Sequence, residues 1–403
     1  MPSLLALLPG VPLPANTGGA LRALQVLRAL DAQFDVTTLA WGTGGQDLER
    51  LLRGTVHLTP RPGRVDALFA EAVGLMLGCP AGYPRYGWFP SKLQRLLEAK
   101  KFDAIHFDHP HTALSFPLIQ RLQPEARLVL DAHNVEAEIV ERVAESAPAW
   151  QRRALRWQAR RIRELERDLA RRMDLVLTCS ERDAEAFRAM GARRVRVVPN
   201  AVPPLAPPIV AQRRNVVFVG SLDWRPNAEA AVILARDIWP RCRALLPGAR
   251  LAIVGRNPPA QVNALAGPDV IIAGNVPDVT PWLDGAFATA VPLRAGSGTR
   301  IKILEAWAAG VPVVASPVAA EGLPYTDGRD ILIAGEPSDF ARALVRLWRD
   351  RQLAEELAAA GRATVAPFAA DQVAKAVARH YRELLESARP YSDAYEPAMA
   401  ATS

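Results

Sequence analysis

The sequence predicts an α/β protein made of two open parallel sheets in tandem, and three observations support this fold class. Short apolar runs of strand length alternate with stretches whose apolar residues recur at helical spacing. Strands separated in this way pair in parallel, and the intervening helices cover both faces of the sheet. The chain of 403 residues is too long for one hydrophobic core, and residues 199–214 contain five prolines, as an interdomain linker would.

The first series of strands begins at residues 4–8 and leads into a loop rich in proline and glycine that opens a helix. We expect the other strands of this series at residues 35–41, 55–60, 104–109, 127–134, 174–180 and 194–200. Residues 65–78 have the apolar spacing of a helix. The first ten residues lack a basic segment and reach Pro9 early, so they indicate a strand rather than a signal peptide.

A second series of strands follows the proline-rich segment. We expect its strands at residues 215–221, 250–256, 270–276, 287–293, 312–317 and 330–335, and helices at 299–309, 339–360 and 370–387. The two series predict four parts: a first domain (1–203), a second domain (204–370), a C-terminal helix that returns to the first domain (371–387), and a flexible tail (388–403).

The composition is that of a globular enzyme. Half of the residues are hydrophobic and 23% are charged, and no apolar run reaches the length of a membrane-spanning helix. The three cysteines, Cys79, Cys179 and Cys242, are odd in number and far apart, so they predict neither a disulfide framework nor a metal site. We therefore expect a reducing, cytoplasmic setting.

The net charge of +7 is concentrated in residues 150–172. This segment has nine arginines against three acidic residues, a net charge of +6, and its arginines recur at helical spacing. The pattern suits an anionic membrane surface, but it favours the alternative of a solvated charged face above an apolar stripe. Nucleic acid is disfavoured because no aromatic or groove-reading motif accompanies the arginines. The basic stripe is Arg153, Arg156, Arg160, Arg163, Arg167 and Arg171, and the apolar stripe is Leu155, Ile162, Leu165 and Leu169.

The most informative segment is residues 296–316, which predict a glycine-punctuated loop, a helix over 299–309 and a buried strand. The helix is closed by Gly310 and is apolar almost all round, which is typical of a buried helix. Yet its first turn carries Arg300 and Lys302, whose charges oppose the helix dipole. That placement suits a bound anion, and we expect the loop amides and both cations to hold a phosphate.

Glu305 lies about two turns into the same helix. A carboxylate there can accept hydrogen bonds from hydroxyl groups such as a ribose diol. The alternative is that Lys302 and Glu305, three positions apart, pair with each other and bind nothing. That alternative leaves Arg300 and the two glycines of the loop unexplained.

Polar side chains follow two strands of the first series. His133 ends one strand, and Asp108, His109 and His111 crowd the end of another. Ligands of open parallel sheets bind at the carboxyl ends of the strands, so the active site is expected between the two domains. We expect the second group to contact an acceptor or to handle protons. A metal site is disfavoured because His-x-His with one aspartate lacks a fourth ligand.

Further residues flank these strand ends. Asn134 and Glu136 follow His133 in the same loop, where Glu136 either contacts sugar hydroxyls or opens the next helix. Gly18 and Gly19 lie between the first strand and its helix. They either admit a ligand close to the backbone or form a tight turn, and the sequence leaves both interpretations open.

Two sets of motifs, one in each half, carry a family resemblance. The second half contains GSLDWRPN (220–227), IVGRNPP (253–259), GNVPDV (274–279), VPLRAGSGTRIKILEAWAAGVPVVAS (291–316) and AAEGL (319–323). The first half contains FDAIHFDHPH (102–111), LDAHNVEAEIVER (130–142), TCSERD (178–183) and VVPNAV (197–202). Over about residues 3–385 the chain resembles the retaining glycosyltransferases of the GT-B fold, family 4, and in particular bacterial sugar transferases with GSGTRxKxLEA and DxHNxE motifs.

The resemblance implies an α/β fold of the GT-B type, in which two Rossmann-like domains face each other across a cleft. It implies a nucleotide-sugar donor of the UDP or GDP type on the second domain, an acceptor on the first, retention of configuration, and neither metal nor other cofactor. Glu305 matches a ribose-binding glutamate, and His133 matches a histidine near the reacting carbon. Arg300 and Lys302 complete the expected catalytic set. The other expected donor-binding residues are Gly296, Ser297, Gly298, Thr299, Gly220, Ser221, Arg225, Arg256, Val276, Gly18 and Gly19, and the acceptor-binding residues are Asp108, His109, His111, Asn134 and Glu136.

Two departures from the family pattern concern charge. The first glutamate of the family's E-x7-E motif falls on Ser297, and the usual arginine and lysine of a GRL…KG pattern are missing after the first strand of the second domain. Negative charge grows on the diphosphate as it leaves, so cations are needed there. Arg300 and Lys302 are the expected replacements, with Arg225 in reserve.

The sequence therefore predicts transfer of a sugar to an acceptor hydroxyl, in glycan, polysaccharide or glycoconjugate biosynthesis. The acceptor stays open among glycans, lipid-linked molecules and small molecules, and the cytoplasmic protein has the option of a peripheral membrane location through 150–172. Two rivals are a nucleotide-sugar epimerase of the same architecture and a non-catalytic membrane-surface protein with a degenerate donor site. A nicotinamide-dependent oxidoreductase is disfavoured because no GxGxxG turn follows the first strand.

Overall fold

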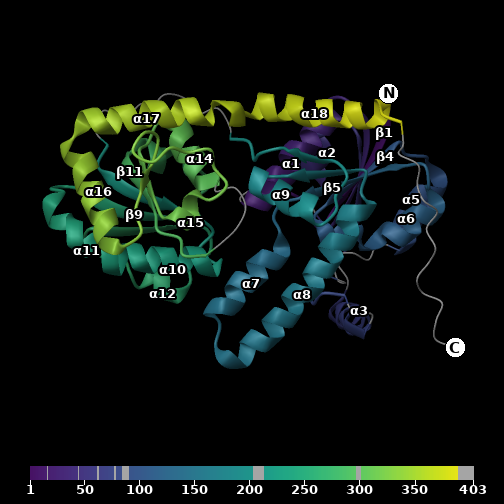
Figure 1. The fold of residues 1–403 in the computed structure, drawn as a ribbon, viewed down its shortest axis with the longest axis horizontal. Coiled ribbons are helices and arrows are strands. Elements are labelled where there is room, and N and C mark those ends of the chain that lie inside the picture. Colours follow the sequence, from purple (N-terminus) through teal and green to yellow (C-terminus); the bar gives the residue numbers. More distant parts are fainter. Residues whose placement is uncertain are drawn as a thin grey trace.

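The computed structural model contains two open α/β units, one in each half of the chain (Figure 1). It describes residues 1–15, 17–43, 45–60, 63–76, 79–83, 90–202, 213–295 and 301–388. Every pairing between the strands of the two sheets is parallel, so the predicted fold class is confirmed. Most of the expected linker and most of the expected tail lie outside the described residues.

The N-terminal sheet has seven strands in the order β3-β2-β1-β4-β5-β6-β7. They are β1 (Ser3–Leu8), β2 (Asp35–Trp41), β3 (Thr55–Thr59), β4 (Ala104–Asp108), β5 (Arg127–Ala132), β6 (Leu175–Thr178) and β7 (Val195–Val197). β1 is buried from Leu4 to Leu8, as expected of a central strand that is covered on both faces. The strand order reverses between β1 and β4, and open sheets bind ligands at such a point.

The helices of this unit follow their strands with recognisable start signals. Thr17 accepts a hydrogen bond from the backbone N–H of Ala20 at the start of α1, and Ser180 accepts one from Asp183 at the start of α9. The helices are α1 (Gly18–Asp31), α2 (Gln46–Leu51), α3 (Arg64–Met76), α5 (Pro90–Ala99), α6 (Phe116–Leu122), α7 (Glu136–Ser146), α8 (Ala149–Arg172) and α9 (Glu181–Ala189), with a 3-10 turn at Pro110–Ser115.

α7 and α8 pack against each other and project from the N-terminal unit (Figure 1). The amphipathic pattern predicted for α8 is confirmed, because Ile162 and Leu169 are buried whereas most of its arginine stripe is exposed. No helix in the described part of the chain has the length and apolarity that crossing a bilayer requires.

The C-terminal sheet has six strands in the order β10-β9-β8-β11-β12-β13. They are β8 (Asn215–Val219), β9 (Arg250–Gly255), β10 (Val270–Gly274), β11 (Ala286–Val291), β12 (Val313–Ala315) and β13 (Leu332–Ile333). The last two are shorter than the sequence predicted. β11 is buried along its whole length, and its register against β8 shifts between Ala286 and Ala288.

The helices of the C-terminal unit include the one that the sequence singled out, α14. Its residues Ile303, Leu304, Ala306 and Trp307 are buried, and Gly310 has the positive φ of 62° expected after a helix end. The helices are α10 (Arg225–Ile233), α11 (Trp239–Cys242), α12 (Ala260–Asn263), α13 (Thr280–Asp284), α14 (Ile301–Ala308), α15 (Pro317–Ala320), α16 (Pro337–Arg349), α17 (Arg351–Val365) and α18 (Ala370–Glu386), with a π turn at Leu234–Ile238 and 3-10 turns at Arg243–Leu245 and Ala366–Phe368.

The single helix predicted over 339–360 is wrong, because the chain forms α16 and α17 there. Asp350 leaves the helical conformation, with φ −109° and ψ 88°, and its carboxylate accepts from the backbone N–H of Leu353 at 3.0 Å. An aspartate that caps a new helix competes with continuation of the old one.

The last helices span both units: α17 covers the C-terminal unit, and α18 packs on α1 of the N-terminal unit (Figure 1). Tyr381 of α18 is fully buried, and its hydroxyl lies 2.7 Å from Nδ1 of His106 in β4. α18 is thereby anchored against the central strands of the first sheet.

Candidate active site

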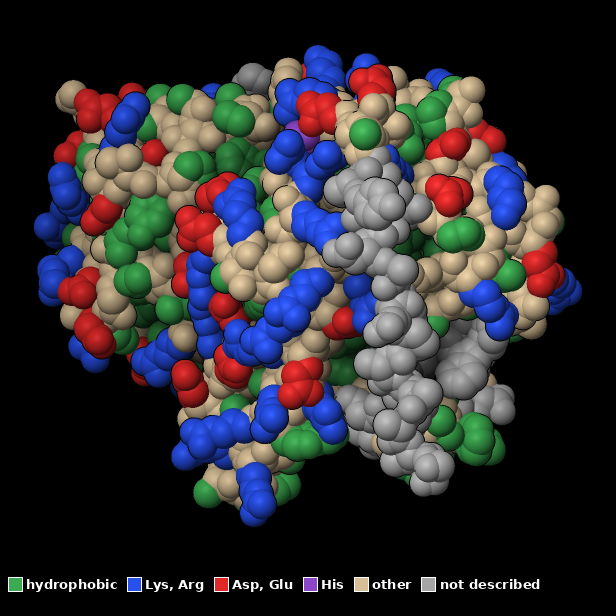
Figure 2. Space-filling model, turned by 45° about the vertical axis from the view of Figure 1, so that its right-hand side comes forward, with side chains coloured by type: hydrophobic (Ala, Val, Ile, Leu, Met, Phe, Trp, Pro, Cys, Tyr) green, Lys and Arg blue, Asp and Glu red, His purple; other side chains and the backbone are tan. Residues whose placement is uncertain are grey.

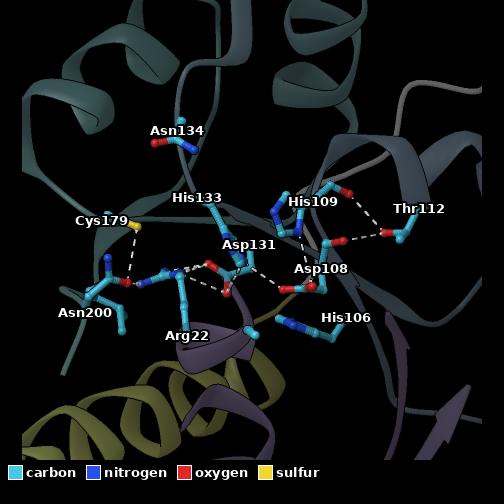
Figure 3. Close-up of polar contacts among 12 residues, drawn as sticks. Arg22, His106, Asp108, His109, Thr112, Asp131, His133, Asn134, Cys179 and Asn200 are labelled. Atoms are coloured by element: carbon cyan, nitrogen blue, oxygen red, sulfur yellow. Dashed lines mark hydrogen bonds and ion pairs between the residues drawn. The ribbon is translucent and has the colours of Figure 1, made fainter. Parts of the chain in front are cut away.

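The carboxyl ends of β4 and β5 bring four ionisable side chains together (Figure 3). Asp108 is the last residue of β4 and pairs in register with Asp131 of β5. His109 follows β4, and His133 follows β5. Both aspartates are buried, so each requires partners that offset the loss of water.

Asp131 is held by Arg22 of α1, a residue that the sequence pattern did not single out. Nε of Arg22 lies 2.9 Å and 3.1 Å from the two carboxylate oxygens, and Nη2 lies 2.5 Å from Oδ1. Nη1 donates to the carbonyl of Val198 at 2.6 Å and to Oδ1 of Asn200 at 3.3 Å. Burial opposes the guanidinium charge, but Asp131 keeps the pKa of Arg22 above its usual value. The ion pair therefore fixes α1 to the end of β5 and to the loop after β7.

Asp108 holds two histidines at once. Its Oδ1 lies 2.8 Å from Nε2 of His133, and its Oδ2 lies 3.1 Å from Nδ1 of His109. Burial opposes ionisation of Asp108, but His133 and His109 hold its pKa well below the usual value. For His109, burial acts to lower the pKa. The Asp108 carboxylate has the larger combined effect, so the pKa of His109 is raised. For His133, burial and then the His109 charge lower the pKa. The favoured arrangement is an ionised Asp108 between a neutral His133 and a His109 whose pKa is raised.

The neutral His133 presents its second nitrogen toward α1. Because Nε2 donates to Asp108, Nδ1 is left as an acceptor. A Cβ placed on Gly19 would lie 3.6 Å from that Nδ1 and 3.9 Å from Cε1 and Nε2 of His109. The glycine therefore exposes bare backbone opposite both rings, as the close-approach interpretation of Gly19 requires.

Three histidines lie in a row along this edge. The ring centroids of His109 and His133 are 3.7 Å apart, and those of His109 and His111 are 5.1 Å apart. His109 has a positive φ of 76°, which is uncommon outside glycine, although histidine adopts it more often than most residues do. Tyr83 packs edge-on against His111 at 5.6 Å. Burial, and then the His109 charge, lower the pKa of His111 to about 3, so His111 is neutral at pH 7.

Glu166 of α8 binds the segment that follows His133, where α7 begins. Its buried carboxylate accepts from the backbone N–H groups of Glu136 at 2.6 Å and Ala137 at 3.4 Å, at the N-terminus of α7. Burial raises the pKa of Glu166 to about 8. Within the loop, Asn134 donates to the Glu136 carboxylate at 3.3 Å. Glu136 thus opens the next helix, and α8 supplies the cap.

The second half of the site lies at the start of α14. Nζ of Lys302 lies 2.6 Å from Oδ1 of Asn227 and 4.4 Å from the ring centroid of Phe218. A Cβ on Gly220 would lie 2.9 Å from the same ammonium. Lys302 therefore reaches across to the carboxyl end of β8, the strand after which the expected arginine and lysine pair is missing.

Glu305 is partly buried one turn further along α14. In the described part of the chain its carboxylate has no hydrogen-bond partner, and no ion pair joins it to Lys302, whose ammonium binds Asn227 instead. Burial raises the pKa of Glu305 to about 7, with Lys302 acting in the opposite direction. A partly buried carboxylate without a described partner can accept hydrogen bonds from the hydroxyl groups of a ligand.

Two further expected donor residues, Arg225 and Arg256, contact carboxylates of the protein. Nε of Arg225 lies 2.6 Å from Oε1 of Glu229 on the exposed side of α10. Nη2 of Arg256 lies 3.4 Å from Oδ2 of Asp223. Val276 is partly buried just after β10.

The remaining expected donor residues include five that the structure does not place. The carbonyl of Ser221 accepts from Nδ2 of Asn227 at 2.8 Å, which ties the turn after β8 to the residue that binds the Lys302 ammonium. The expected donor contacts of the loop remain predictions, because its residues lie outside the described part: Gly296, Ser297, Gly298, Thr299 and Arg300.

Contacts between the two units frame this site. A Cβ on Gly18 would lie 3.3 Å from Cδ1 of Ile301, so the N-terminal ends of α1 and α14 face each other. Glu321, just after α15, accepts from Arg142 of α7 at 2.9 Å and pairs with Arg182 of α9 at 2.8 Å. Gly18, one of the expected donor-binding residues, thus lies on an edge of the first unit that faces the start of α14.

Among the described residues, two groups of side chains have ligand atoms close enough to share a metal ion: Asp108, His109 and His133, and His106, Asp108 and Asp131. In the first group both histidines are already bonded to the Asp108 carboxylate. In the second, Asp131 already neutralises the Arg22 guanidinium, and a cation beside a cation is unfavourable. The carboxylates are thus engaged by other partners, and the expectation of a metal-free site stays a prediction.

Comparison with known sequences relates each half to a family. Residues 17–204 match the sequence model of Glycosyltransferase Family 4, and residues 213–350 match that of Glycosyl transferases group 1. A phosphatidyl-myo-inositol mannosyltransferase of Mycobacterium leprae is 31% identical over 181 residues. That match covers 43% of this chain and 48% of the relative, so the chain spans about half the length of the curated protein that it matches.

Solved structures share the fold over nearly the whole chain. HepE of Anabaena, in complex with UDP and glucose, has a TM-score of 0.69 at 16% identity, covering 95% of this chain and 100% of that one. Sucrose-phosphate synthase of Thermosynechococcus elongatus has a TM-score of 0.67 at 18% identity, covering 95% and 99%. At such identities the likeness shows the fold alone, which is the α/β GT-B fold of two Rossmann-like domains. Each half therefore matches a glycosyltransferase family model, and the fold is that of the GT-B glycosyltransferases.

Proposed function

We propose that this protein transfers a glycosyl unit from a nucleotide-sugar donor to an acceptor hydroxyl, with retention of anomeric configuration. The observation that carries the proposal is the pairing of two groups on α14. Lys302 brings an ammonium to the end of β8, and one turn later Glu305 offers a carboxylate that no described residue satisfies. A nucleotide sugar has one group that needs a cation, the diphosphate, and one that suits a carboxylate, the ribose diol.

In this proposal Lys302 replaces the missing arginine and lysine pair. It comes from a different element but delivers its charge to the same strand end, beside Gly220. Its role is to stabilise the charge that grows on the departing diphosphate, together with Arg300 and the amides of the preceding loop. The reserve candidate Arg225 is not needed, because it is exposed and paired with Glu229.

The donor sugar is proposed to lie alongside Gly19 and His133, at the edge that they form together. Nδ1 of His133 would accept a hydrogen bond from a sugar hydroxyl, and Asp108 would act behind it by keeping Nε2 protonated. No described side chain at this edge is an obvious covalent nucleophile, so attack of the acceptor from the face that the diphosphate leaves is the proposed route. In this proposal His109 and His111 contact the acceptor.

The donor class and the cellular setting are also proposed. The mycobacterial relative is a mannosyltransferase, and HepE was solved with UDP and glucose, so UDP and GDP sugars are the donors to test first. We propose a role in glycan, polysaccharide or glycoconjugate synthesis, at the cytoplasmic side of a membrane, without metal or other cofactor. The basic face of α8 supports the peripheral location.

The test is calorimetric titration of UDP, GDP and their sugars into the wild-type protein and two variants. Glu305→Ala should weaken nucleotide binding by at least about tenfold, because hydrogen bonds to a charged group are lost. The exposed Glu355→Ala on α17 is the matched control and should bind as the wild type does. Unchanged affinity in Glu305→Ala would reject the site. Incubation with donor alone should leave it unconverted, whereas conversion would favour the epimerase.

A further inference from the structure

α3 turns a continuous apolar face to solvent. Val65, Leu68, Phe69 and Met76, here called the α3 apolar face, recur at helical spacing and are between 69% and 80% exposed. Amphipathic helices of globular proteins normally turn such a face inward. Monomeric proteins rarely leave contiguous apolar surface uncovered, so this face is expected to have a partner.

The exposed apolar residues cluster with the N-terminal half of α8. Of the ten large hydrophobic side chains that are exposed in the described part of the chain, four form the α3 apolar face and two, Trp150 and Trp157, lie on α8. The two helices are tied together by the segment that follows α3. The amide of Gln158 donates to and accepts from the backbone of Ala81 at 2.9 Å each way, and the N–H of Gly82 donates to Glu71 of α3.

Beside this apolar surface α8 is strongly basic, although Glu141 and Glu145 of α7 line one hollow together with Arg156, Arg160 and Arg163. Residues 149–163 contain six arginines and no acidic residue. Arg153 and Arg156 are exposed and form no ion pair in the described part of the chain, whereas Arg160 and Arg161 share Glu164 further along α8. Figure 2 shows lysine and arginine side chains gathered on the lower projection, which α7 and α8 form.

We propose that α3 and the N-terminal half of α8 dock together onto an anionic lipid bilayer. The α3 apolar face would enter the boundary between headgroups and acyl chains, and Trp150 and Trp157 would lie at headgroup level. Arg153 and Arg156 would contact the anionic headgroups. A protein partner would have to supply apolar and acidic surface together, whereas an anionic bilayer presents both.

The docked surface leads directly to the acceptor side of the site. The segment 79–83 runs from α3 to Tyr83, whose ring packs edge-on against His111. This step rests on the proposed function. Because the docked surface adjoins the histidine row, the acceptor class that it favours is a hydroxyl group of a lipid-linked molecule at the membrane surface.

Sedimentation with vesicles tests the docking. The full-length protein should sediment with phosphatidylcholine vesicles that contain added phosphatidylglycerol, and weakly with phosphatidylcholine alone. Leu68→Ser with Phe69→Ser, and separately Arg153→Glu with Arg156→Glu, should each reduce binding to the anionic vesicles by about tenfold or more. All four side chains are exposed, so the fold should tolerate the changes.

Matched controls lie on other exposed surfaces. Leu51→Ser with Leu245→Ser removes two exposed leucines elsewhere, and Arg236→Glu with Arg329→Glu makes the same charge change on the C-terminal unit. Both should sediment as the wild type does. Vesicle binding that survives the α3 pair, or that falls equally in the controls, would overturn the proposal. So would a dimer in analytical ultracentrifugation that the α3 pair abolishes, since it would identify a second copy as the partner.

Nucleotide titration separates this inference from the proposed function. The α3 and arginine pairs should bind nucleotide as the wild type does, since neither touches α14. Loss of vesicle binding with intact nucleotide binding supports the docking surface. Vesicle binding without any nucleotide binding would leave the docking surface standing and reject the transferase.

Discussion

Glu305→Gln should stabilise the ligand-free protein at pH 8 and lower its affinity for nucleotides. Burial raises the pKa of Glu305 to about 7, from an ordinary value of 4.5. A raised folded-state pKa means that the stabilising contribution is complete below pH 4.5 and is lost as the pH rises through 7. At pH 8 the ionised carboxylate therefore destabilises the fold, and an uncharged amide of the same shape removes that penalty.

The magnitude follows from the displacement of the pKa. Moving it from 4.5 to about 7 corresponds to about 3 kcal/mol, and the part of the carboxylate that faces solvent reduces this to about 2 kcal/mol. For a unit of this size, the melting temperature of the variant should rise by roughly 4 to 8 °C at pH 8. At pH 5 only about a quarter of the gain should remain.

Thermal unfolding at both pH values, with and without a sugar nucleotide, measures the prediction. The ligand should raise the melting temperature of the wild type but hardly that of Glu305→Gln, because bound ligand stabilises by mass action. Glu355→Gln, on an exposed surface of α17, should change neither quantity. A variant that is less stable than the wild type at pH 8, or equally stabilised at both pH values, would refute the claim that the buried, ionised Glu305 carboxylate destabilises the fold.

Three other substitutions test the rest of the site. Lys302→Gln should lower kcat by about 100-fold or more in a steady-state assay, because its charge acts on the leaving group; an unaltered kcat would exclude that role. Asp108→Asn should lower the pKa of the neighbouring charged histidine, seen by NMR titration, and shift the acid limb of the pH–rate profile with it, and a profile that stays in place would show that Asp108 does not set the histidine charges. Arg22→Ala should cost about 3 to 5 kcal/mol in denaturant unfolding, since it leaves Asp131 buried and unpaired, whereas Arg28→Ala on the exposed side of the same helix should cost little.

Features set by local pattern were predictable from the sequence. The alternation of apolar runs predicted two parallel sheets, and the end of α14 just before Gly310 followed from a glycine that adopts a positive φ. The two stripes of α8 followed from helical spacing alone. These features depend on neighbours within a few residues, and such neighbours are visible in a linear sequence.

Features set by distant partners were not predictable. The Arg22–Asp131 ion pair joins residues 109 positions apart, and the signal was no more than an arginine in an apolar helix. Asp350 looked like one more polar residue in a helical stretch until its cap divided the helix. The apolar spacing of α3 resembles that of any core-facing helix, and only the fold shows that the face carrying Phe69 is left uncovered.

Glu166 joins two regions that have different tasks. Its helix, α8, carries the outward-facing arginines, while its carboxylate is bonded to the first amides of α7, directly after the His133 loop. α8 cannot slide or rotate without straining those two bonds, so any event that repositions this helix also shifts the histidine. A buried glutamate thus ties the segment after His133 to the helix that carries the outer arginines, and an α8 without this glutamate would lose both hydrogen bonds.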